Sequence, residues 1–111
     1  MSARLVIVSG AFAGRELPLI DGVNVLGRGE TRDPSRPEID LDTIDIDAKV
    51  SRRHAQIDYS AKSKEVYIQD LGSLNGVYLN TGQRLDPERK IRLQNNEEIL
   101  VGNIILRLVL D

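Results

Sequence analysis

The chain has 111 residues, of which 41% are apolar, and a formal net charge of −2. This length predicts one domain, residues 1–111, with a buried core, and no apolar run approaches the ~18 residues that a membrane-spanning helix needs. The slightly acidic charge argues against a domain whose main task is to neutralise a nucleic-acid backbone.

Cysteine is absent, which excludes a disulfide framework and a thiolate metal site. The start of the chain, residues 1–5, lacks the apolar stretch of a secretion signal, so we expect a cytoplasmic protein or module. Eleven of the fifteen basic residues are arginine, whose planar side chain suits phosphate and carboxylate. Genome composition can produce the same bias toward arginine, so the bias is only a hint of phosphate or carboxylate binding.

Apolar and polar residues alternate with a period of two along most of the chain, which predicts strands. Pro18 predicts that its strand lies at a sheet edge or that this position does not pair through its N–H, and Gly102-Asn103 predicts a tight hairpin. A turn of helix is expected only within residues 87–92, and residues 29–37 form a polar loop with two prolines. The pattern predicts an all-β sandwich or barrel with strands at 4–8, 15–20, 23–26, 38–41, 54–59, 65–70, 77–79, 97–101 and 104–110.

Four short polar motifs stand at the ends of predicted strands. They are Gly27-Arg28, Ser51-Arg52-Arg53-His54, the stretch from Leu71 to Gly76 (Leu-Gly-Ser-Leu-Asn-Gly), and Leu79-Asn80. A strand, a turn and a second strand separate the second motif from the third, so both lie at the same end of a sheet. Together the motifs predict a small anion pocket built from loops on a rigid β scaffold.

The ordered set of motifs resembles the forkhead-associated (FHA) domain pattern, and the resemblance covers essentially the whole chain. It implies a two-sheet β-sandwich of about eleven short strands with binding loops at one end. It also implies phosphothreonine-dependent peptide binding in Ser/Thr kinase signalling. The partner is then the kinase or its substrate; no enzyme activity, cofactor, metal, nucleic acid or membrane is expected.

The resemblance assigns six residues to the phosphopeptide site. Arg28 and Ser51 hold the phosphate, Ser51 through its hydroxyl and its backbone N–H, and Arg52 touches the phosphate or the adjacent peptide. Asn75 clamps the peptide backbone, while Ser73 and Leu74 contribute hydroxyl or main-chain contacts. Arg53 faces away, because adjacent residues of an extended segment alternate in direction.

Four further residues are expected to support the loops: Gly27, His54, Gly76 and Asn80. A catalytic role for His54 is not favoured, because the chain offers neither a cysteine nucleophile nor a metal-ligand partner at helical spacing. Val77 stands where the family usually has threonine, which removes a hydroxyl able to bond within the loops.

Each of these residues also has a purely structural interpretation. Arg28 is near enough in sequence to pair with Glu30 or Asp33 on the surface. Ser51 is a common turn residue, and Asn75 can occupy a position of positive φ in an Asn-Gly turn. These alternatives stay open from the sequence alone.

An acidic stretch precedes the second motif and contains Glu38, Asp40, Asp42, Asp45 and Asp47. It can repel an acidic peptide or neutralise Arg52 and Arg53 when no partner is bound. A calcium loop is not favoured because the glycine and closing glutamate of a known loop are missing. We therefore expect a solvated acidic loop.

Two functions of other classes remain as alternatives. One is a β-sandwich scaffold that assembles with itself or another subunit and does not read phosphate. The other is single-stranded nucleic-acid binding, which only four aromatic residues and an acidic net charge argue against.

Overall fold

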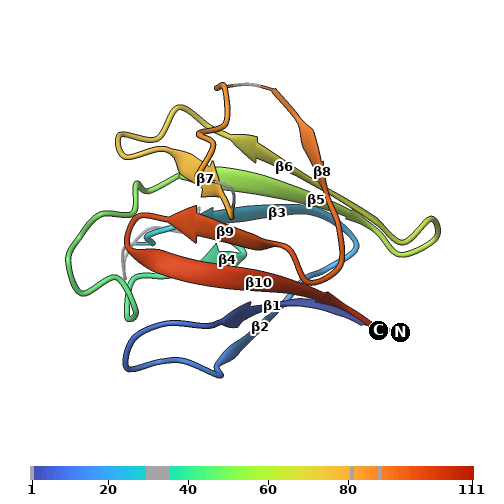
Figure 1. Ribbon diagram of the computed structural model, residues 1–111, viewed down its shortest axis with the longest axis horizontal. Coiled ribbons are helices and arrows are strands. Elements are labelled where there is room, and N and C mark those ends of the chain that lie inside the picture. Colours follow the sequence, from blue (N-terminus) through green and yellow to red (C-terminus); the bar gives the residue numbers. More distant parts are fainter. Residues whose placement is uncertain (1, 30–35, 81, 88) are drawn as a thin grey trace.

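Two five-stranded sheets pack face to face in the computed structural model, which describes residues 2–29, 36–80, 82–87 and 89–111 (Figure 1). Within these residues every regular element is a strand, and no helix is long and apolar enough to span a membrane. The predicted all-β sandwich is confirmed, with ten strands described where about eleven were expected. The strands are β1 (Ala3–Ile7), β2 (Glu16–Pro18), β3 (Gly22–Gly27), β4 (Ile39–Asp40), β5 (Ala55–Ser60), β6 (Glu65–Asp70), β7 (Val77–Leu79), β8 (Ile91–Leu93), β9 (Glu98–Val101) and β10 (Ile104–Leu110).

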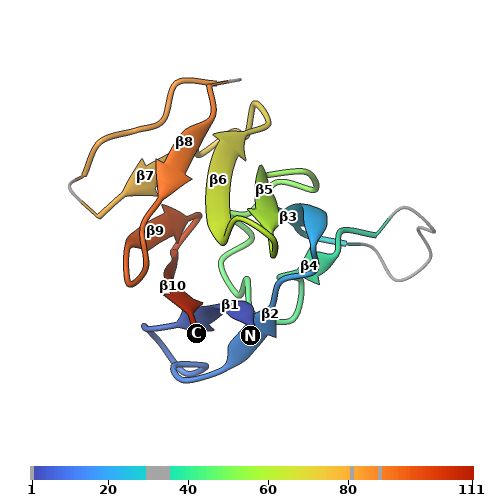
Figure 2. The same ribbon diagram turned by 90° about the vertical axis from the view of Figure 1, so that its right-hand side faces the viewer.

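The first sheet has the strand order β2-β1-β10-β9-β7, and the second has the order β4-β3-β5-β6-β8. All neighbours are antiparallel except β3 and β4. Strand β2 lies at an edge, as Pro18 predicted, because proline has no N–H to give to a second neighbour. The two sheets are seen nearly end-on in Figure 2.

Alternation of side chains explains why these segments form a sandwich. In β5 and β10, apolar residues at every second position are buried between the sheets and the intervening residues face outward. The largest fully buried side chains come from both sheets and from the segment before β5: Leu5, Ile7, Leu26, Leu41, Val50, Ile57, Val66, Ile68, Ile99, Leu106 and Leu108.

The expected turn of helix within residues 87–92 is wrong at its end, because Ile91–Leu93 forms strand β8. Ile91 pairs with Ile68 and Leu93 with Val66 of β6. Burial of alternate apolar side chains against a neighbouring strand decides the conformation here, which local sequence did not reveal. The hairpin at Gly102-Asn103 is confirmed, with Val101 paired to Ile104 and Gly102 at φ +61°.

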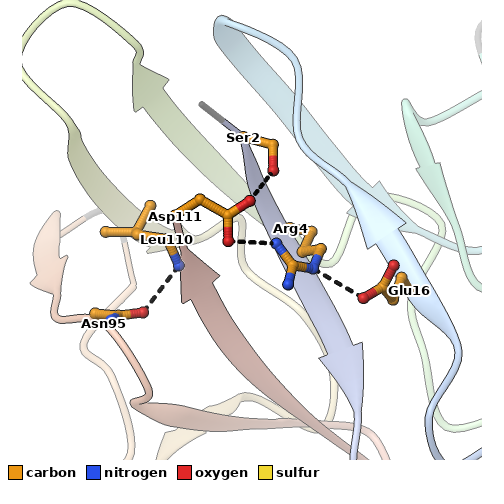
Figure 3. A network of polar contacts seen from close by, with 6 residues as sticks. All are labelled: Ser2, Arg4, Glu16, Asn95, Leu110 and Asp111. Atoms are coloured by element: carbon orange, nitrogen blue, oxygen red, sulfur yellow. Dashed lines mark hydrogen bonds and ion pairs between the residues drawn. The ribbon is translucent and has the colours of Figure 1, made fainter.

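The two ends of the chain meet at one end of the sandwich, and residues 40–54 and 71–76 lie at the other (Figure 1). At the ends, the Ser2 hydroxyl donates to Asp111 over 2.6 Å, and the Arg4 guanidinium contacts Asp111 and Glu16 (Figure 3). The hydrogen bond from Ser2, followed by that from Arg4, lowers the pKa of the Asp111 carboxyl. This network closes the end of the sandwich opposite to the predicted binding loops.

Candidate functional site

Three segments that are distant in sequence meet at the loop end of the sandwich: residues 27–29, 49–54 and 71–76. The Arg28 N–H donates to the Ser51 carbonyl over 3.1 Å. The Leu74 N–H donates to Ser51 Oγ over 3.2 Å, and Asn75 Nδ2 donates to the Lys49 carbonyl over 2.8 Å. Arg28, Ser51 and Asn75 therefore lie around one rim.

Gly27 brings the first two segments into direct backbone contact. A Cβ atom at this position would lie 1.9 Å from the Arg52 carbonyl oxygen, far inside van der Waals contact. Any side chain would push residues 51–53 away from the strand that carries Arg28. Glycine is required at residue 27 for its small size, which agrees with the expected supporting role.

His54 joins the second and third segments from beneath. Its side chain is fully buried, its Nδ1 accepts from the Ser51 N–H over 3.0 Å, and its Nε2 lies 2.8 Å from the Gly76 carbonyl. Since a backbone N–H only donates and a carbonyl only accepts, the ring carries its proton on Nε2. One imidazole thus fixes the spacing between Ser51 and the turn that holds Asn75.

The His54 contacts correct one expectation about Ser51. The Ser51 N–H donates to the His54 ring, so it is not available to an anion. The Ser51 Oγ accepts from Leu74, which leaves the hydroxyl proton as the group that Ser51 can offer at the rim.

Ser73 is buried, with 7% of its surface exposed, and it holds the third segment together. Its N–H donates to Asp70 Oδ1, and its Oγ accepts from the Gly76 N–H, both over 3.0 Å. Leu74, in contrast, is 85% exposed. In the Asn-Gly turn, positive φ falls on Gly76 at +79° and not on Asn75, so that alternative interpretation of Asn75 is wrong.

Two carboxylates that the sequence assigned to a solvated loop are structural. Asp45 is buried, and its two oxygens accept from the backbone N–H groups of Lys49 and Val50, directly before Ser51. Asp40 accepts from the Gly29 N–H over 2.9 Å, directly after Arg28. Sequence reasoning missed both roles. Asp40 bonds to a segment eleven residues away, and the acidic stretch does not show which of its carboxylates turns inward to cap the backbone, as Asp45 does.

Asp40 also forms an ion pair with Arg36, at 2.7 Å from Nη2 to Oδ2. Partial burial alone would raise the pKa of the Asp40 carboxyl. Hydrogen bonds from Arg36 and from the Gly29 and Asp42 N–H groups outweigh this effect, so the pKa lies below its ordinary value. The carboxylate thereby stays charged and keeps the segment after Arg28 anchored.

Arg28 differs in its surroundings from three other arginines. Arg4, Arg36 and Arg107 are each paired with carboxylates. The half-buried Arg28 side chain forms no ion pair with any residue that the structure describes, and Glu30 and Asp33 lie outside those residues. The rim therefore retains positive charge on a guanidinium whose backbone is fixed next to Ser51.

Gly76 and Asn80, the remaining two residues expected to support the loops, differ in their surroundings. Gly76 has a φ of +79°, which other residues rarely adopt, and a Cβ there would displace the flexible Arg84 side chain, whose Nε would lie 2.6 Å away. Asn80 is exposed at the end of β7, and its side chain forms no hydrogen bond with another described residue, so the structure offers no evidence for a supporting role. Val77 is fully buried, and the Gly76 carbonyl serves as the His54 partner without any threonine hydroxyl.

Comparison with known proteins places this geometry in context. The family model described as the FHA domain matches residues 24–102. Glycogen accumulation regulator GarA of Mycobacterium tuberculosis is 34% identical over 105 residues, which are 95% of this chain and 56% of GarA. The chain thus spans little more than half the length of this relative.

Two solved structures share the fold. An FHA domain from work on phosphothreonine-dependent FHA domain interactions has a TM-score of 0.75 at 26% identity, covering 100% of this chain and 98% of that one. EmbR of Mycobacterium tuberculosis in complex with a low-affinity phosphopeptide has a TM-score of 0.74 at 26% identity, covering 97% of this chain and 24% of that one.

Proposed function

Since the chain belongs to the FHA domain family, we propose that it binds partner proteins through a phosphothreonine that a Ser/Thr kinase has introduced. The observation that carries this proposal is the meeting of Arg28, Ser51 and Asn75 at one rim through hydrogen bonds between their segments. The module recognises a modified side chain and performs no chemistry on it.

The proposed phosphate contacts come from Arg28, Ser51 and Arg52. A phosphothreonine carries a charge of about −1.5 to −2 at neutral pH and three strong acceptor oxygens. The guanidinium of Arg28 donates to two oxygens at once, and the Ser51 hydroxyl donates to a third. Arg52, exposed in the same loop, adds a second cation.

The proposed clamp on the peptide backbone is Asn75. Its Nδ2 is tied to the Lys49 carbonyl, which orients the side chain, and its Oδ1 has no partner among the described residues. The oxygen is therefore positioned to accept from a peptide N–H, and the second Nδ2 hydrogen can donate to a peptide carbonyl. Ser73, buried beneath the turn, supports this geometry instead of touching the peptide.

These contacts suffice for a reversible switch. Three or four charge-assisted hydrogen bonds, each contributing ~1.5–3 kcal/mol before ordering costs, bring affinity into the micromolar range. Without the phosphoryl group most of these bonds have no acceptor, so the unmodified segment is not retained.

The test is a titration of the domain with a degenerate phosphothreonine peptide library, its unphosphorylated twin and the Arg28→Ala variant. We expect binding of the phosphorylated library only, with at least about a tenfold loss in Arg28→Ala. Arg92→Ala is the matched control, because Arg92 lies on β8 and faces Glu65. Equal binding of both libraries, or full affinity in Arg28→Ala, would contradict the proposal.

A further inference from the structure

A groove of about 380 Å³ is lined in part by residues 44–47 of the loop that also carries Ser51. Its walls are the loop between β1 and β2, the segment 44–47 and the start of β10. The apolar part of the lining includes Phe12, Ile44, Ile46 and Ile105. Ile46 is 77% exposed, although burying such a large apolar side chain is energetically favourable.

The outer face of the first sheet extends this apolar surface. Tyr78 pairs with Leu100, Leu100 pairs with Ile105, and the Val8 N–H donates to the Ile105 carbonyl. Since neighbouring residues in register point to the same face, these four side chains form one outward row across four adjacent chain segments. A second depression, of about 260 Å³, also contains Ile105, so the row connects both.

The charge of the groove indicates what it binds. Among the residues that the structure describes, its lining contains Asp45 and Asp47 and neither lysine nor arginine. Asp45 accepts from backbone N–H groups and Asp47 accepts from Asn103, and no described cation forms an ion pair with either carboxylate. An apolar floor beside two carboxylates is complementary to an apolar side chain that has lysine or arginine as a neighbour.

We propose that this groove and the Val8–Ile105–Leu100–Tyr78 row form a second docking surface, which binds a protein segment carrying an apolar anchor flanked by lysine or arginine. The segment needs no phosphate, so the inference goes beyond the proposed function and does not rest on it. A second copy of the chain fits less well, because two-fold pairing through this face brings the same carboxylates of both copies into one interface.

Asp45 connects the two surfaces physically. It lines the groove, and its carboxylate holds the N–H groups of Lys49 and Val50, the residues directly before Ser51. A partner that carries both a phosphothreonine and a basic-apolar segment therefore contacts two faces of the same loop. Joining two weak contacts in one partner raises the overall affinity without any new interaction.

The test is selection of short, unphosphorylated, randomised peptides displayed on phage, with the wild-type domain as bait. We expect the enriched peptides to share an aliphatic or aromatic residue with an adjacent lysine or arginine. Their affinity should fall at least about tenfold in Ile46→Ser and in Asp47→Asn, which removes the charge but keeps an acceptor for Asn103. Ile20→Ser is the matched control, because Ile20 is 55% exposed and follows Leu19, whose N–H donates to the Ala3 carbonyl near the chain ends.

Two results would overturn the inference. One is the absence of any enriched basic-apolar motif, or enrichment of peptides that bind both groove variants as tightly as they bind the wild type. The other is a concentration-dependent dimer in gel filtration that Ile46→Ser abolishes, which would show that the surface binds a second copy of the chain. Because the displayed peptides carry no phosphate, failure of this inference leaves the phosphothreonine proposal intact, and the reverse also holds.

Discussion

The His54 ring bridges the Ser51 N–H and the Gly76 carbonyl, and these two bonds of 3.0 and 2.8 Å fix the distance between the loops of the rim. Both partners are backbone groups, so the bridge does not depend on which side chains stand at those positions. A fully buried imidazole with both nitrogens bonded is a framework group, so we expect His54 to hold the two loops in place without contacting a ligand.

Replacing His54 with alanine removes both bonds at once. We expect the free energy of unfolding to fall by about 2–5 kcal/mol, because the change leaves a cavity and two unpaired buried polar groups. Urea unfolding measures this loss, and Lys62→Ala in the exposed turn between β5 and β6 serves as the control. A loss below about 0.5 kcal/mol, as for an ordinary surface substitution, would contradict the framework role.

Gly27→Ala tests the backbone contact between the first two segments. The added Cβ meets the Arg52 carbonyl, so the loop must shift, and we expect a loss of about 1–3 kcal/mol in stability together with weaker phosphopeptide binding. Gly10→Ala is the control, since its Cβ has open space and only the positive φ of +75° is strained. Unchanged peptide affinity in Gly27→Ala would show that the contact does not position Arg28 and Ser51.

Asn75→Ala separates peptide clamping from phosphate binding. We expect this variant to bind a phosphothreonine peptide about tenfold more weakly than the wild type does. Free phosphothreonine should bind to it almost as tightly as to the wild type. Arg28→Ala should weaken the binding of both ligands, because we propose that Arg28 contacts the phosphate. Isothermal titration with both ligands makes the distinction, and Asn95→Ala at the opposite end is the control. Equal losses for both ligands in Asn75→Ala would reject the clamp.

The lowered pKa of the Asp40 carboxyl predicts that the free energy of unfolding depends on pH in the acidic range. Its pKa in the folded protein lies below the ordinary value of 3.8, so its contribution to stability is complete above that value. The contribution is lost as the pH falls through the lower, folded pKa. Asp40→Asn should therefore be less stable than the wild type at pH 7, and the difference should vanish in strong acid, measured by urea unfolding across pH. The exposed Asp42 provides a control in Asp42→Asn, and a difference that persists at the lowest pH would contradict the ion-pair account.

The sequence predicts most of the fold, because periods of two and specific turn residues are local signals. Strands β5, β6 and β10 lie within one residue of their predicted bounds, and Pro18 and Gly102-Asn103 behave as expected. Strand β8 was not predicted, since its three residues gain their conformation from pairing with β6.

The site was predictable in its residue types and less so in its hydrogen bonds. Spacing along the chain brings Arg28, Ser51 and Asn75 to the same end, but which donors remain free depends on packing. Ser51 gives its N–H to His54, and Ser73 is buried beneath the turn. Asp40 and Asp45 anchor loops by accepting from backbone N–H groups, and the acidic stretch alone does not show which of its carboxylates do so.

The most direct measurement of the central claim is an amide chemical-shift titration of the ¹⁵N-labelled domain with a phosphothreonine peptide that the library selects. We predict that the largest shifts fall on residues 27–29, 49–54 and 71–76, and that the Arg28 and Asn75 side-chain signals move with them. Shifts centred instead on the opposite end of the sandwich, around Ile20 and the chain ends, would contradict a phosphate site at the Arg28–Ser51–Asn75 rim.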